Sequence, residues 1–586
     1  MITTRVSSAG HLTISEHGVF LHPANAKTRP GKKVAERIQV RALVTREGTT
    51  NKSVDLGFID CNGEFAEVTI SPSDFADFRR FRTWLLDNGY KFPADPKIAQ
   101  MLHSYVVEQA PIQRRHVLHR PGWYENHYVF ADERVRLTDR VLSFQAADPA
   151  HARNFGTAGT LEGWKTGVAK YGCHSTRLTF SISLALASAL LRFTDVESGG
   201  IHLTGDSGIG KTTSLLVAAS VGGKAIRDSL FSWDSTKTGL DELAAAYNDN
   251  LLGLDEIERA PDTAGRAKEI RDAAFRLAGG TGRIRSALYG AKTGKQSITW
   301  RLFFISTGET SLNEVAHIES MKRLKGEQVR AIDLPGEVHD QFGIFESLPA
   351  EYTDSRKLVE NIEVECQKNY GVALREFVKC VARDSATISA DIEALMQMFF
   401  TDARVPEKRW EHRFSKRFAL AYAAVKLAIK YEIVPWDGRM VAHAIKACYE
   451  AARSCVPDAS TIRNSGLVHL RDRLTRADTV MEVRPIETRD VDLLKRARVL
   501  HRADPQRPHF LVRPNVFKTW FDSDVQADLV LQYLDSNGYL EKDVVKTGAQ
   551  QRLLRTVQRH ITGIPGRLRY HAIRDAFLND TYFETA

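Results

Sequence analysis

The sequence predicts a multidomain α/β protein built around a P-loop ATPase core. Its 586 residues are too many for one hydrophobic core, so three or four domains are expected. The run Gly-Asp-Ser-Gly-Ile-Gly-Lys-Thr at 205–212 has the spacing of a phosphate-binding loop. From about residue 200 to 345, apolar strand-like runs alternate with helical ones, which is typical of a parallel sheet covered by helices.

Five segments follow from these patterns along the chain. Residues 1–37 mix Gly, Pro, Lys and Ser and are expected to be partly loose. Residues 38–150 combine alternating runs with helical ones and predict an N-terminal α+β domain. The ATPase core is expected at 151–350, and an almost wholly helical lid at 351–456. Residues 457–586 are mixed, and their order of helix, helix and strand hairpin predicts a winged-helix-like domain.

Several local patterns give more definite elements. In the N-terminal domain, Asp60–Gly63 predicts a hairpin turn, Ser73–Ala110 two helices, and 122–130 a short hairpin. In the lid, 419–428 is the clearest amphipathic helical stretch. Near the C-terminus, a helix is expected from Val525 until Gly538 ends it.

Composition limits the function classes without choosing one. No run of eighteen apolar residues is present, which predicts no membrane span, and the first residues lack a signal-peptide layout. The six cysteines are scattered without a Cys-x-x-Cys pair, so neither structural zinc nor a disulfide framework is expected. A cytoplasmic location follows as the expectation. The net charge of +9 is compatible with a polyanionic partner but does not require one.

The loop at 205–212 is expected to hold the phosphates of ATP. Its glycines let backbone N–H groups wrap closely around phosphates. Lys211 would bring a positive charge to the β- and γ-phosphates, and Thr212 would offer its hydroxyl to Mg²⁺. A chance match is the alternative, disfavoured by the apolar strand before the loop and the helix after it. The expected ATP-binding residues are Gly205, Asp206, Ser207, Gly208, Ile209, Gly210, Lys211, Thr212 and Thr213.

A second, acidic motif follows about forty residues later. Leu-Leu-Gly-Leu-Asp-Glu at 251–256 is an apolar run that ends in two carboxylates. Asp255 would hold Mg²⁺ through water, and Glu256 would polarise the attacking water. Such a run also arises by chance, but its spacing from the P-loop favours the functional interpretation. A carboxylate for water indicates a hydrolase rather than a phosphotransferase.

A third apolar strand is predicted at 302–305, and hydroxyl residues follow it directly. A polar side chain at this point can sense the γ-phosphate or position the water, which is the sensor-1 role of AAA+ motors. The sequence does not choose between Ser306 and Thr307. The alternative is a strand end capped by hydroxyl turn chemistry.

Glycines and basic residues interleave from 282 to 295, between the acidic motif and the third strand. This pattern predicts a β-hairpin whose tip carries Lys292 and Lys295, with Arg283 and Arg285 nearer its start. In ring helicases a hairpin inserted before the sensor strand points into the pore and holds the DNA backbone. Phosphate contacts of this kind give sequence-independent, salt-dependent affinity. A solvated basic loop is the alternative.

Together these motifs resemble the family catalogued as domain of unknown function 927. The resemblance runs from about residue 38 to 455, and the family more often shows Ala-Gly-Gln within 325–333. The lid has Val425 and Lys426 where the family commonly has Gly-Glu. The matching motifs are Gly122-Trp123, 203–213, 221–223, Trp233, Thr236, 249–251, 254–256, Trp300, 306–309 and 325–333.

This resemblance implies a hexameric AAA+ motor related to the minichromosome-maintenance helicases and carried by plasmids, phages and integrated elements. Ring motors complete each ATP site with an arginine from the neighbouring subunit. Arg330 is the first candidate for that role and Arg323 the second, while Arg417 in the lid is a sensor-2-type candidate. The acidic clusters and zinc-ligand cysteines of a fused primase are missing.

The expected function is therefore an ATP- and Mg²⁺-dependent DNA helicase that acts on single-stranded and forked DNA during replication of a mobile element. A homo-hexamer, with a separate primase or single-strand-binding protein as further partners, is the expected assembly. The alternative is an ATP-regulated loader, initiator or defence switch without processive unwinding. A small-molecule kinase is disfavoured by the chain length and by Glu256, and a packaging motor by the lack of a following nuclease-like acidic cluster. A C-terminal duplex contact is expected through Arg552, Arg555, Arg559, Arg567 and Arg569, the first three on one helix face.

Overall fold

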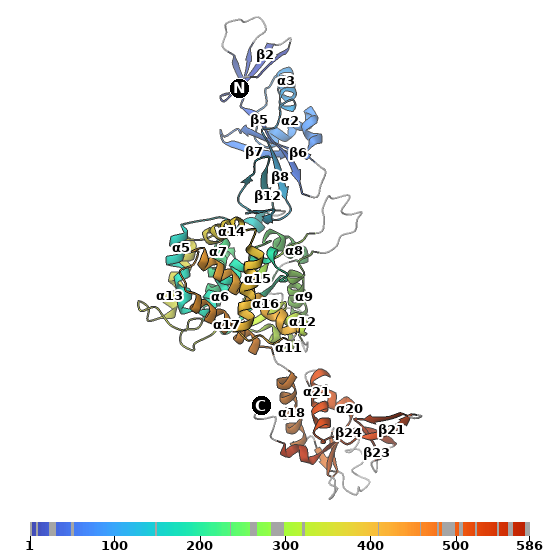
Figure 1. Ribbon diagram of the computed structural model, residues 1–586. Helices are drawn as coiled ribbons and strands as arrows, with labels where there is room; N and C mark the ends of the chain where they lie inside the picture. The colour runs from blue at the N-terminus through green and yellow to red at the C-terminus, as the bar shows by residue number, and fades with distance from the viewer. Residues whose placement is uncertain are drawn as a thin grey trace. The chain divides into compact units, whose positions relative to one another are not determined.

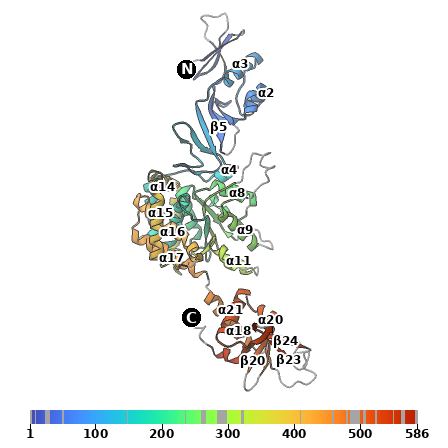
Figure 2. The same ribbon diagram turned by 45° about the vertical axis from the view of Figure 1, so that its right-hand side comes forward.

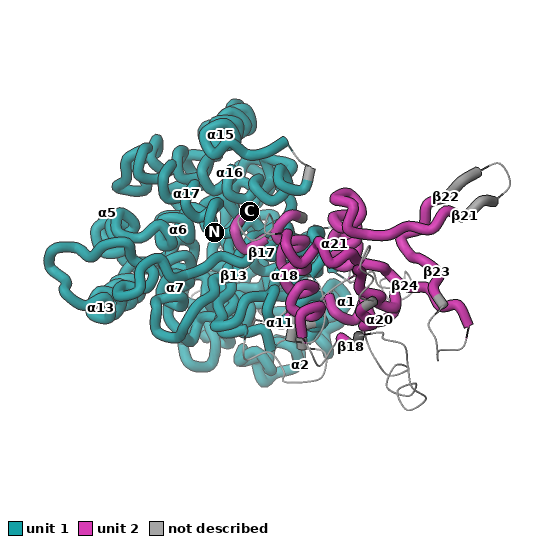
Figure 3. The backbone as a smooth tube through the Cα atoms, turned by 90° about the horizontal axis from the view of Figure 1, so that it is seen from below, with its two compact units in different colours: residues 1–315, 323–452 teal, residues 316–322, 453–586 magenta. Residues whose placement is uncertain are grey.

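The structure, a computed structural model, forms two compact units (Figures 1 and 3). The first unit holds residues 1–315 and 323–452, and the second holds 316–322 and 453–586. Within the described part of the chain, no helix combines the length and hydropathy needed to cross a bilayer. The described residues are 3–7, 10–22, 31–47, 52–146, 149–234, 236–257, 266–282, 298–318, 323–407, 409–456, 459–476, 480–482, 499–502, 508–521, 524–547, 550–560 and 566–580.

The beginning of the chain forms a small antiparallel sheet. Its strands pair in chain order: β1 (Thr3–Ser7), β2 (Gly10–Ser15), β3 (Gly18–His22) and β4 (Lys32–Ala35). The sequence predicts a partly loose segment at 1–37, whereas the structure describes four strands within it. Leu12 and Val19 are fully buried and share a hydrophobic core with Ile38 and Leu56 of the following sheet. The burial of these apolar side chains supplies the stability that the Gly and Pro content did not suggest.

A six-stranded mixed sheet follows, as the alternating runs predict. Its order is β11 (Val135–Arg136), β12 (Val141–Phe144), β8 (Gln113–Leu118), β5 (Ile38–Arg46), β6 (Lys52–Ile59) and β7 (Phe65–Ile70). The predicted turn joins β6 to β7, and the predicted hairpin is β9 (Gly122–Tyr124) with β10 (His127–Val129).

Three helices, rather than the predicted two, lie between β7 and β8. They are α1 (Pro72–Ala76), α2 (Phe78–Asp87) and α3 (Pro96–Val107). Asp77 separates the first two because its backbone is extended and its carboxylate accepts a hydrogen bond from Arg80 N, capping α2. Asp95 caps α3 in the same way.

The P-loop core has a five-stranded sheet in which all strands are parallel. Their order is β14 (Phe231–Ser232), β15 (Leu251–Asp255), β16 (Phe303–Gly308), β13 (Gly199–Thr204) and β17 (Ala331–Pro335). All six residues of β16 are buried, as expected for a sheet covered on both faces. Because the strands are parallel, the carboxyl ends of β13, β16 and β15 lie side by side at one edge.

Helices surround this sheet. Those within the core are α4 (Pro149–Ala152), α5 (Leu161–Gly167), α6 (Thr176–Ser188), α7 (Lys211–Gly222), α8 (Lys237–Ala246), α9 (Arg266–Gly279), α11 (Leu312–Ile318) and α12 (Lys325–Gln328), with short 3-10 turns η1 (Ala169–His174), η2 (Leu191–Phe193) and η3 (Arg227–Ser229). Every residue of α6 is buried, because α7 and α16 pack against it.

Helices occupy most of residues 355–454, the segment predicted as a helical lid. It consists of α13 (Ser355–Lys368), α14 (Val372–Arg383), α15 (Ile388–Asp402), α16 (Arg409–Lys430) and α17 (Gly438–Ser454). Figure 2 shows α15, α16 and α17 on one side of the core and α8, α9 and α11 on the other. The amphipathic expectation for 419–428 is wrong: Phe418 to Val425 are all buried, because α6 and α15 pack against α16.

The second unit has its own apolar core, in which Leu467, Phe517 and Leu534 are fully buried. Its five-stranded sheet has the order β18 (Val480–Glu482), β19 (Val499–Arg502), β20 (His509–Val512), β24 (Arg567–Arg574) and β23 (Val557–His560). Its other elements are α18 (Ala459–Thr475), α20 (Pro514–Lys518), α21 (Asp524–Ser536), the hairpin β21 (Asp543–Thr547) with β22 (Gln550–Leu554), and η5 (Asp575–Asn579). Gly538, at φ +72°, ends α21 as predicted.

The predicted helix carrying Arg552, Arg555 and Arg559 is wrong. Arg552 lies on β22 and Arg559 on β23, with Arg555 between these strands. The sequence between these arginines contains no acidic residue, but two of them pair with acidic residues from elsewhere in the unit. Arg555 Nε lies 3.0 Å from Asp535 Oδ2, and Arg559 Nη2 lies 2.9 Å from Glu541 Oε2. These arginines therefore do not form one helix face, and the winged-helix interpretation stays a prediction.

Candidate nucleotide-binding site

The predicted phosphate-binding loop joins β13 to α7, in the strand–loop–helix context that such a loop requires. Gly205, Gly208 and Gly210 all have positive φ, between +84° and +137°. A Cβ on Gly210 would meet Ile344 at 2.9 Å, whereas a Cβ on Gly208 would meet no atom within 4 Å. At Gly208 the backbone conformation, rather than local crowding by the protein, is what favours glycine.

The start of α7 is arranged to receive an anion. Gly210 is its N-cap residue, and no side-chain hydrogen bond caps the helix there within the described residues. The first helical bond runs from Ser214 N to Gly210 O. Lys211 Nζ donates to the carbonyl oxygens of Gly205 and Asp206, at 2.7 Å each, so the ammonium group lies over the loop. A helix N-terminus with a lysine above it can neutralise phosphate charge.

The two predicted acidic and hydroxyl motifs meet beside this loop. Asp255 Oδ1 accepts hydrogen bonds from Thr307 Oγ1 at 2.6 Å and from Thr212 Oγ1 at 3.3 Å. Glu256 N donates to Thr307 Oγ1 at 3.1 Å, and Glu256 has a left-handed backbone with φ +47°. The carboxylate of Asp255 therefore links the start of α7, through Thr212, to the end of β16, through Thr307.

The structure chooses between the two hydroxyl residues that the sequence could not separate. Ser306 Oγ lies 2.8 Å from Nδ1 of His202, a fully buried side chain whose Nε2 is 3.0 Å from Thr310 O. Adjacent strand residues point to opposite faces of a sheet. Ser306 therefore takes part in the packing between β13 and β16, and Thr307 is the hydroxyl residue that contacts Asp255, so Thr307 is the better candidate for the sensor role.

The donor set suits Mg²⁺. The hydroxyl of Thr212 and the carboxylate of Asp255 are hard oxygen ligands in direct contact with each other. Within the described residues, no group of three or more His, Cys, Asp or Glu side chains could form a metal centre of protein ligands alone. Mg²⁺ bound to nucleotide needs only one or two protein ligands, since phosphate and water supply the rest.

A pocket of about 600 Å³ opens at the loop and extends to the lid helix α13. Among its lining residues are Ser207, Gly208 and Ile209 of the loop, Arg227 of η3 and Glu363 of α13. Arg227 and Glu363 were not predicted. They lie far apart in the sequence, and neither belongs to a motif that would have marked it.

The three arginine candidates lie away from this chain's own ATP site. Arg330 directly precedes β17, its Nη1 donates to Gly326 O at 2.8 Å, and its guanidinium lies 4.9 Å from the ring centre of Phe275. This is the amino end of the sheet, about 15 Å from the loop by strand length. Within one chain Arg330 cannot reach the phosphates, and its role in a neighbouring subunit's site stays a prediction.

Two of the candidates are structural. The side chain of Arg323 is 9% exposed, its Nη1 lies 2.8 Å from Asp333 Oδ2, and desolvation lowers its pKa. Arg417 is 3% exposed and donates to the carbonyl oxygens of Val329 and Ser198 at the amino end of the sheet, and burial lowers its pKa to about 10. The sensor-2 expectation for Arg417 is wrong for its own site, because the P-loop lies at the other end of β13. Burial likewise argues against Arg323.

Arg283, Arg285, Lys292 and Lys295 lie outside the described residues, so the predicted hairpin tip stays a prediction. The described ends of that segment run side by side. Thr281 and Thr299 form an antiparallel bridge, and Gly282 N donates to Ile298 O at 2.8 Å. The chain therefore leaves and re-enters the core at neighbouring positions, as the base of a hairpin would.

Asp249 joins the N-terminal domain to the strands of the site. Its side chain is fully buried and accepts two hydrogen bonds from Arg301, at 3.0 and 3.1 Å, and one from Trp123 N at 3.0 Å. Tyr128 donates its hydroxyl hydrogen to Asp249 O at 2.8 Å. Asp249 lies two residues before β15, and Arg301 two before β16. The β9–β10 hairpin thus holds the amino ends of both strands whose carboxyl ends form the site.

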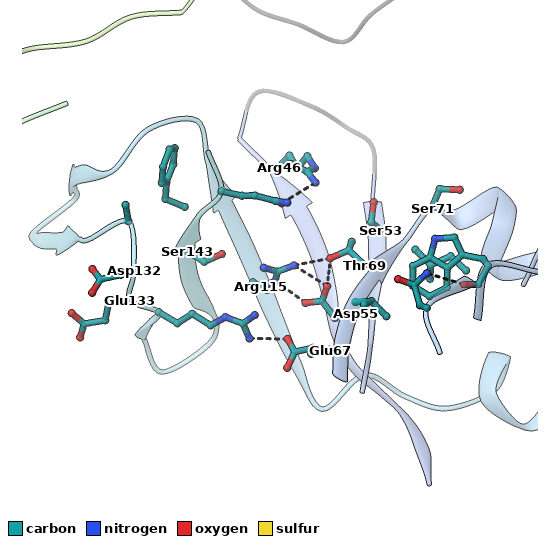
Figure 4. A pocket seen from close by; sticks show the side chains of 18 residues that line it. Arg46, Ser53, Asp55, Glu67, Thr69, Ser71, Arg115, Asp132, Glu133 and Ser143 are labelled. Atoms are coloured by element: carbon teal, nitrogen blue, oxygen red, sulfur yellow. Dashed lines mark hydrogen bonds and ion pairs between the residues drawn. The ribbon is translucent and has the colours of Figure 1, made fainter. Parts of the chain in front are cut away.

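A second pocket, of about 820 Å³, lies in the N-terminal domain (Figure 4). Arg115 and Asp55 form a buried ion pair within it, with Nε and Oδ2 2.6 Å apart, and Thr69 Oγ1 donates to Asp55 Oδ1 at 2.6 Å. Arg134 pairs with Glu67 at 2.7 Å. Arg115 and Arg134 are thus paired with carboxylates of the pocket itself, whereas the P-loop pocket has the phosphate-binding loop on its wall and is the better candidate for ATP.

Comparison with known proteins agrees with this fold. The family described as "Domain of unknown function (DUF927)" matches residues 12–297, so the match begins before the expected range of 38–455 and ends well before that range does. The solved structure described as "SCCmec type IV Cch - active helicase" has a TM-score of 0.64 at 14% identity, covering 98% of this chain and 99% of that one. The apo NrS-1 C-terminal region has a TM-score of 0.25 at 9% identity, covering 70% and 91%, which is too low to argue from. No curated protein matches the sequence. The chain thus has a fold similar to that of the first structure over nearly its full length.

Proposed function

We propose that this chain is an ATP-dependent, ring-forming DNA helicase or translocase. The observation that carries the proposal is the meeting of Lys211, Thr212, Asp255, Glu256 and Thr307 at one edge of the parallel sheet. Lys211 and the start of α7 would hold the β- and γ-phosphates, and Thr212 with Asp255 would hold Mg²⁺. Glu256 would orient the attacking water and accept its proton.

The DNA part of the proposal has separate support. A fold similar to that of a protein described as an active helicase makes strand separation the first activity to test. A basic segment precedes the predicted sensor strand in the sequence and contains Arg283, Arg285, Lys292 and Lys295. The residues on either side of it, Thr281 and Thr299, pair with each other. We infer that this segment contacts the phosphates of single-stranded or forked DNA in the pore of a hexamer.

The placement of Arg330 supports a ring. Arg330 cannot reach the ATP bound by its own chain, so any role it has in hydrolysis requires a second subunit. Replication of a mobile genetic element, together with a separate primase or single-strand-binding protein, is the biological setting that we propose.

The rival function is an ATP-regulated loader, initiator or defence switch that does not unwind DNA processively. The observation that favours it is the contact of Asp249 with both the β9–β10 hairpin and Arg301. A partner that moves the N-terminal domain would shift the strands carrying Asp255 and Thr307, and would thereby regulate hydrolysis.

The ATPase rate with and without single-stranded DNA tests the proposal. A helicase is expected to hydrolyse ATP faster with DNA, and Lys211→Ala is expected to abolish both rates, since it removes the charge over the loop. Hydrolysis by the wild type that is indifferent to DNA of any structure would favour the switch. A wild type that neither binds nor hydrolyses ATP would overturn both functions.

A further inference from the structure

Arg227 lies in the nucleotide pocket but has no part in the chemistry described so far. It begins η3, between α7 and β14, and it lines the pocket together with Ser207 and Gly208. Its side chain is 63% exposed, so a ligand in the pocket can reach it. Most exposed arginines are solvated surface residues without a specific role. The partners of Arg227 therefore decide whether it has one.

Those partners tie Arg227 to the phosphate-binding helix. Glu363 of α13 receives Arg227 Nη2 on Oε1 at 2.8 Å and Arg227 Nε on Oε2 at 3.3 Å. The same Oε1 accepts a hydrogen bond from Thr213 Oγ1 at 2.9 Å. Thr213 directly follows Thr212, the expected Mg²⁺ ligand. The lid helix, the arginine and the first turn of α7 thus share one carboxylate.

The pocket places Arg227 beside the phosphate-binding loop, since Ser207, Gly208 and Ile209 line the same space. The hydrogen bond to Glu363 raises the pKa of Arg227, and the nearby carboxylates of Asp255 and Glu256 raise it further. Asp255 and Glu256 mark the position of Mg²⁺ and the attacking water, next to the γ-phosphate. A guanidinium carries five N–H donors in a planar fork, and Glu363 receives two of them. An arginine can therefore hold a carboxylate and a phosphate together.

We propose that Arg227 binds the γ-phosphate of ATP from within the same chain, and that Glu363 is the residue that positions it. This inference rests on the proposed ATPase function and adds a γ-phosphate contact that needs no neighbouring subunit. ADP lacks the γ-phosphate, so Arg227 provides discrimination between ATP and ADP. Through Glu363, the same contact links the γ-phosphate to the lid helix α13.

The test is the affinity of the full chain for a non-hydrolysable ATP analogue and for ADP, each with Mg²⁺, by titration calorimetry. Arg227→Ala is expected to lower the affinity for the ATP analogue about tenfold to a hundredfold, and the affinity for ADP by less than about twofold. Arg227→Lys keeps the charge without the fork and is expected to fall between the wild type and Arg227→Ala. Glu363→Gln keeps the bond to Thr213 but not the ion pair, and is expected to reduce the ATP-to-ADP preference by a smaller factor.

Arg383→Ala is the matched control. Arg383 is 67% exposed, its Nε lies 3.1 Å from Asp384 Oδ1, and it lies outside the pocket. Arg227→Ala and Arg227→Lys affinities that both equal those of Arg383→Ala would overturn the inference. Equal weakening of both nucleotides by Arg227→Lys would also overturn it, since that pattern reflects a structural ion pair. If the wild type bound neither nucleotide, the proposed function itself would fail, and this result is distinct from the other two.

Discussion

Thr307 donates a hydrogen bond to Asp255 at 2.6 Å, and this contact joins the ends of two neighbouring strands at the nucleotide site. The same hydroxyl oxygen accepts the backbone N–H of Glu256 at 3.1 Å. One small side chain therefore holds the carboxylate expected to bind Mg²⁺ and the backbone of the residue expected to activate water. Its contribution can be separated from that of its neighbour Ser306, which bonds to His202 instead.

Thr307→Val is expected to lower kcat for ATP about tenfold with little change in KM. Valine has nearly the shape of threonine but removes the hydroxyl that orients Asp255 and Glu256, at a cost of about 1–2 kcal/mol. Steady-state ATPase kinetics measure the change. Thr307→Ser keeps the hydroxyl and should retain most of the rate. A Thr307→Val protein as fast as the wild type would remove Thr307 from the site.

Arg330→Ala is expected to assemble normally but to lose at least about a hundredfold in ATPase rate, as trans-acting arginines of motor proteins do. Mixing provides the sharper test. A Lys211→Ala subunit keeps Arg330, which can complete the ATP site of a neighbouring Arg330→Ala subunit whose loop is intact. Mixed assemblies should therefore recover ATPase activity that neither variant has alone. Absence of recovery in assemblies shown to be mixed would contradict a trans role.

Arg323→Ala is expected to act on stability instead. It leaves the carboxylate of Asp333, whose side chain is 2% exposed, buried without its cation, which costs about 3 kcal/mol. The melting temperature should fall clearly, while the ATPase rate per folded protein should fall far less than for Arg330→Ala. If Arg323→Ala instead lost more ATPase rate and Arg330→Ala lost more stability, Arg323 would be the trans-acting candidate and Arg330 the structural residue.

Asp249→Asn is expected to uncouple the N-terminal domain from the ATP site. Asparagine keeps an acceptor for Trp123 N but loses the charge that holds Arg301, and we expect a loss of about 1–3 kcal/mol of stability. Thermal unfolding measures this loss, and limited proteolysis should show faster cleavage between the N-terminal domain and the core. Glu67→Gln breaks the ion pair with Arg134 inside the N-terminal domain and is the control. The same unfolding temperature and the same cleavage rate for the two variants would contradict a role of Asp249 in holding the N-terminal domain to the core.

Lys295→Ala is expected to abolish stimulation of the ATPase by single-stranded DNA while the rate without DNA is unchanged. The expectation comes from the sequence pattern and from the paired ends of the segment that contains Lys295. Lys379→Ala removes an exposed lysine that pairs with Glu376 and should have no effect. Full stimulation of the Lys295→Ala protein at several salt concentrations would exclude a pore contact by this residue.

The sequence predicted those parts of the site that lie within single motifs. The loop at 205–212, the strand ending at Asp255 and the strand containing Thr307 were found because the chemistry of each depends on neighbours along the chain. The choice between Ser306 and Thr307 needed the structure, since it depends on which face of β16 each side chain occupies.

Contacts between distant segments explain what the sequence did not predict. Arg227 and Glu363 become partners only when α13 packs against α7. The N-terminal strands and the buried face of α16 were misjudged because the core that covers them comes from other elements. Arg552 and Arg559 have helical spacing, yet they lie on strands, because pairing with β21 and β24 overrides a pattern in a few residues.

Unwinding of a forked DNA duplex, followed with a fluorescent strand in the presence of Mg²⁺ and ATP, tests the central claim most directly. The account predicts strand separation by the wild type and none by Glu256→Gln, which should still bind ATP because only the group that activates water is changed. A wild-type protein that hydrolyses ATP in the presence of the fork but leaves every duplex intact, with single-strand overhangs of either polarity, would contradict the helicase assignment.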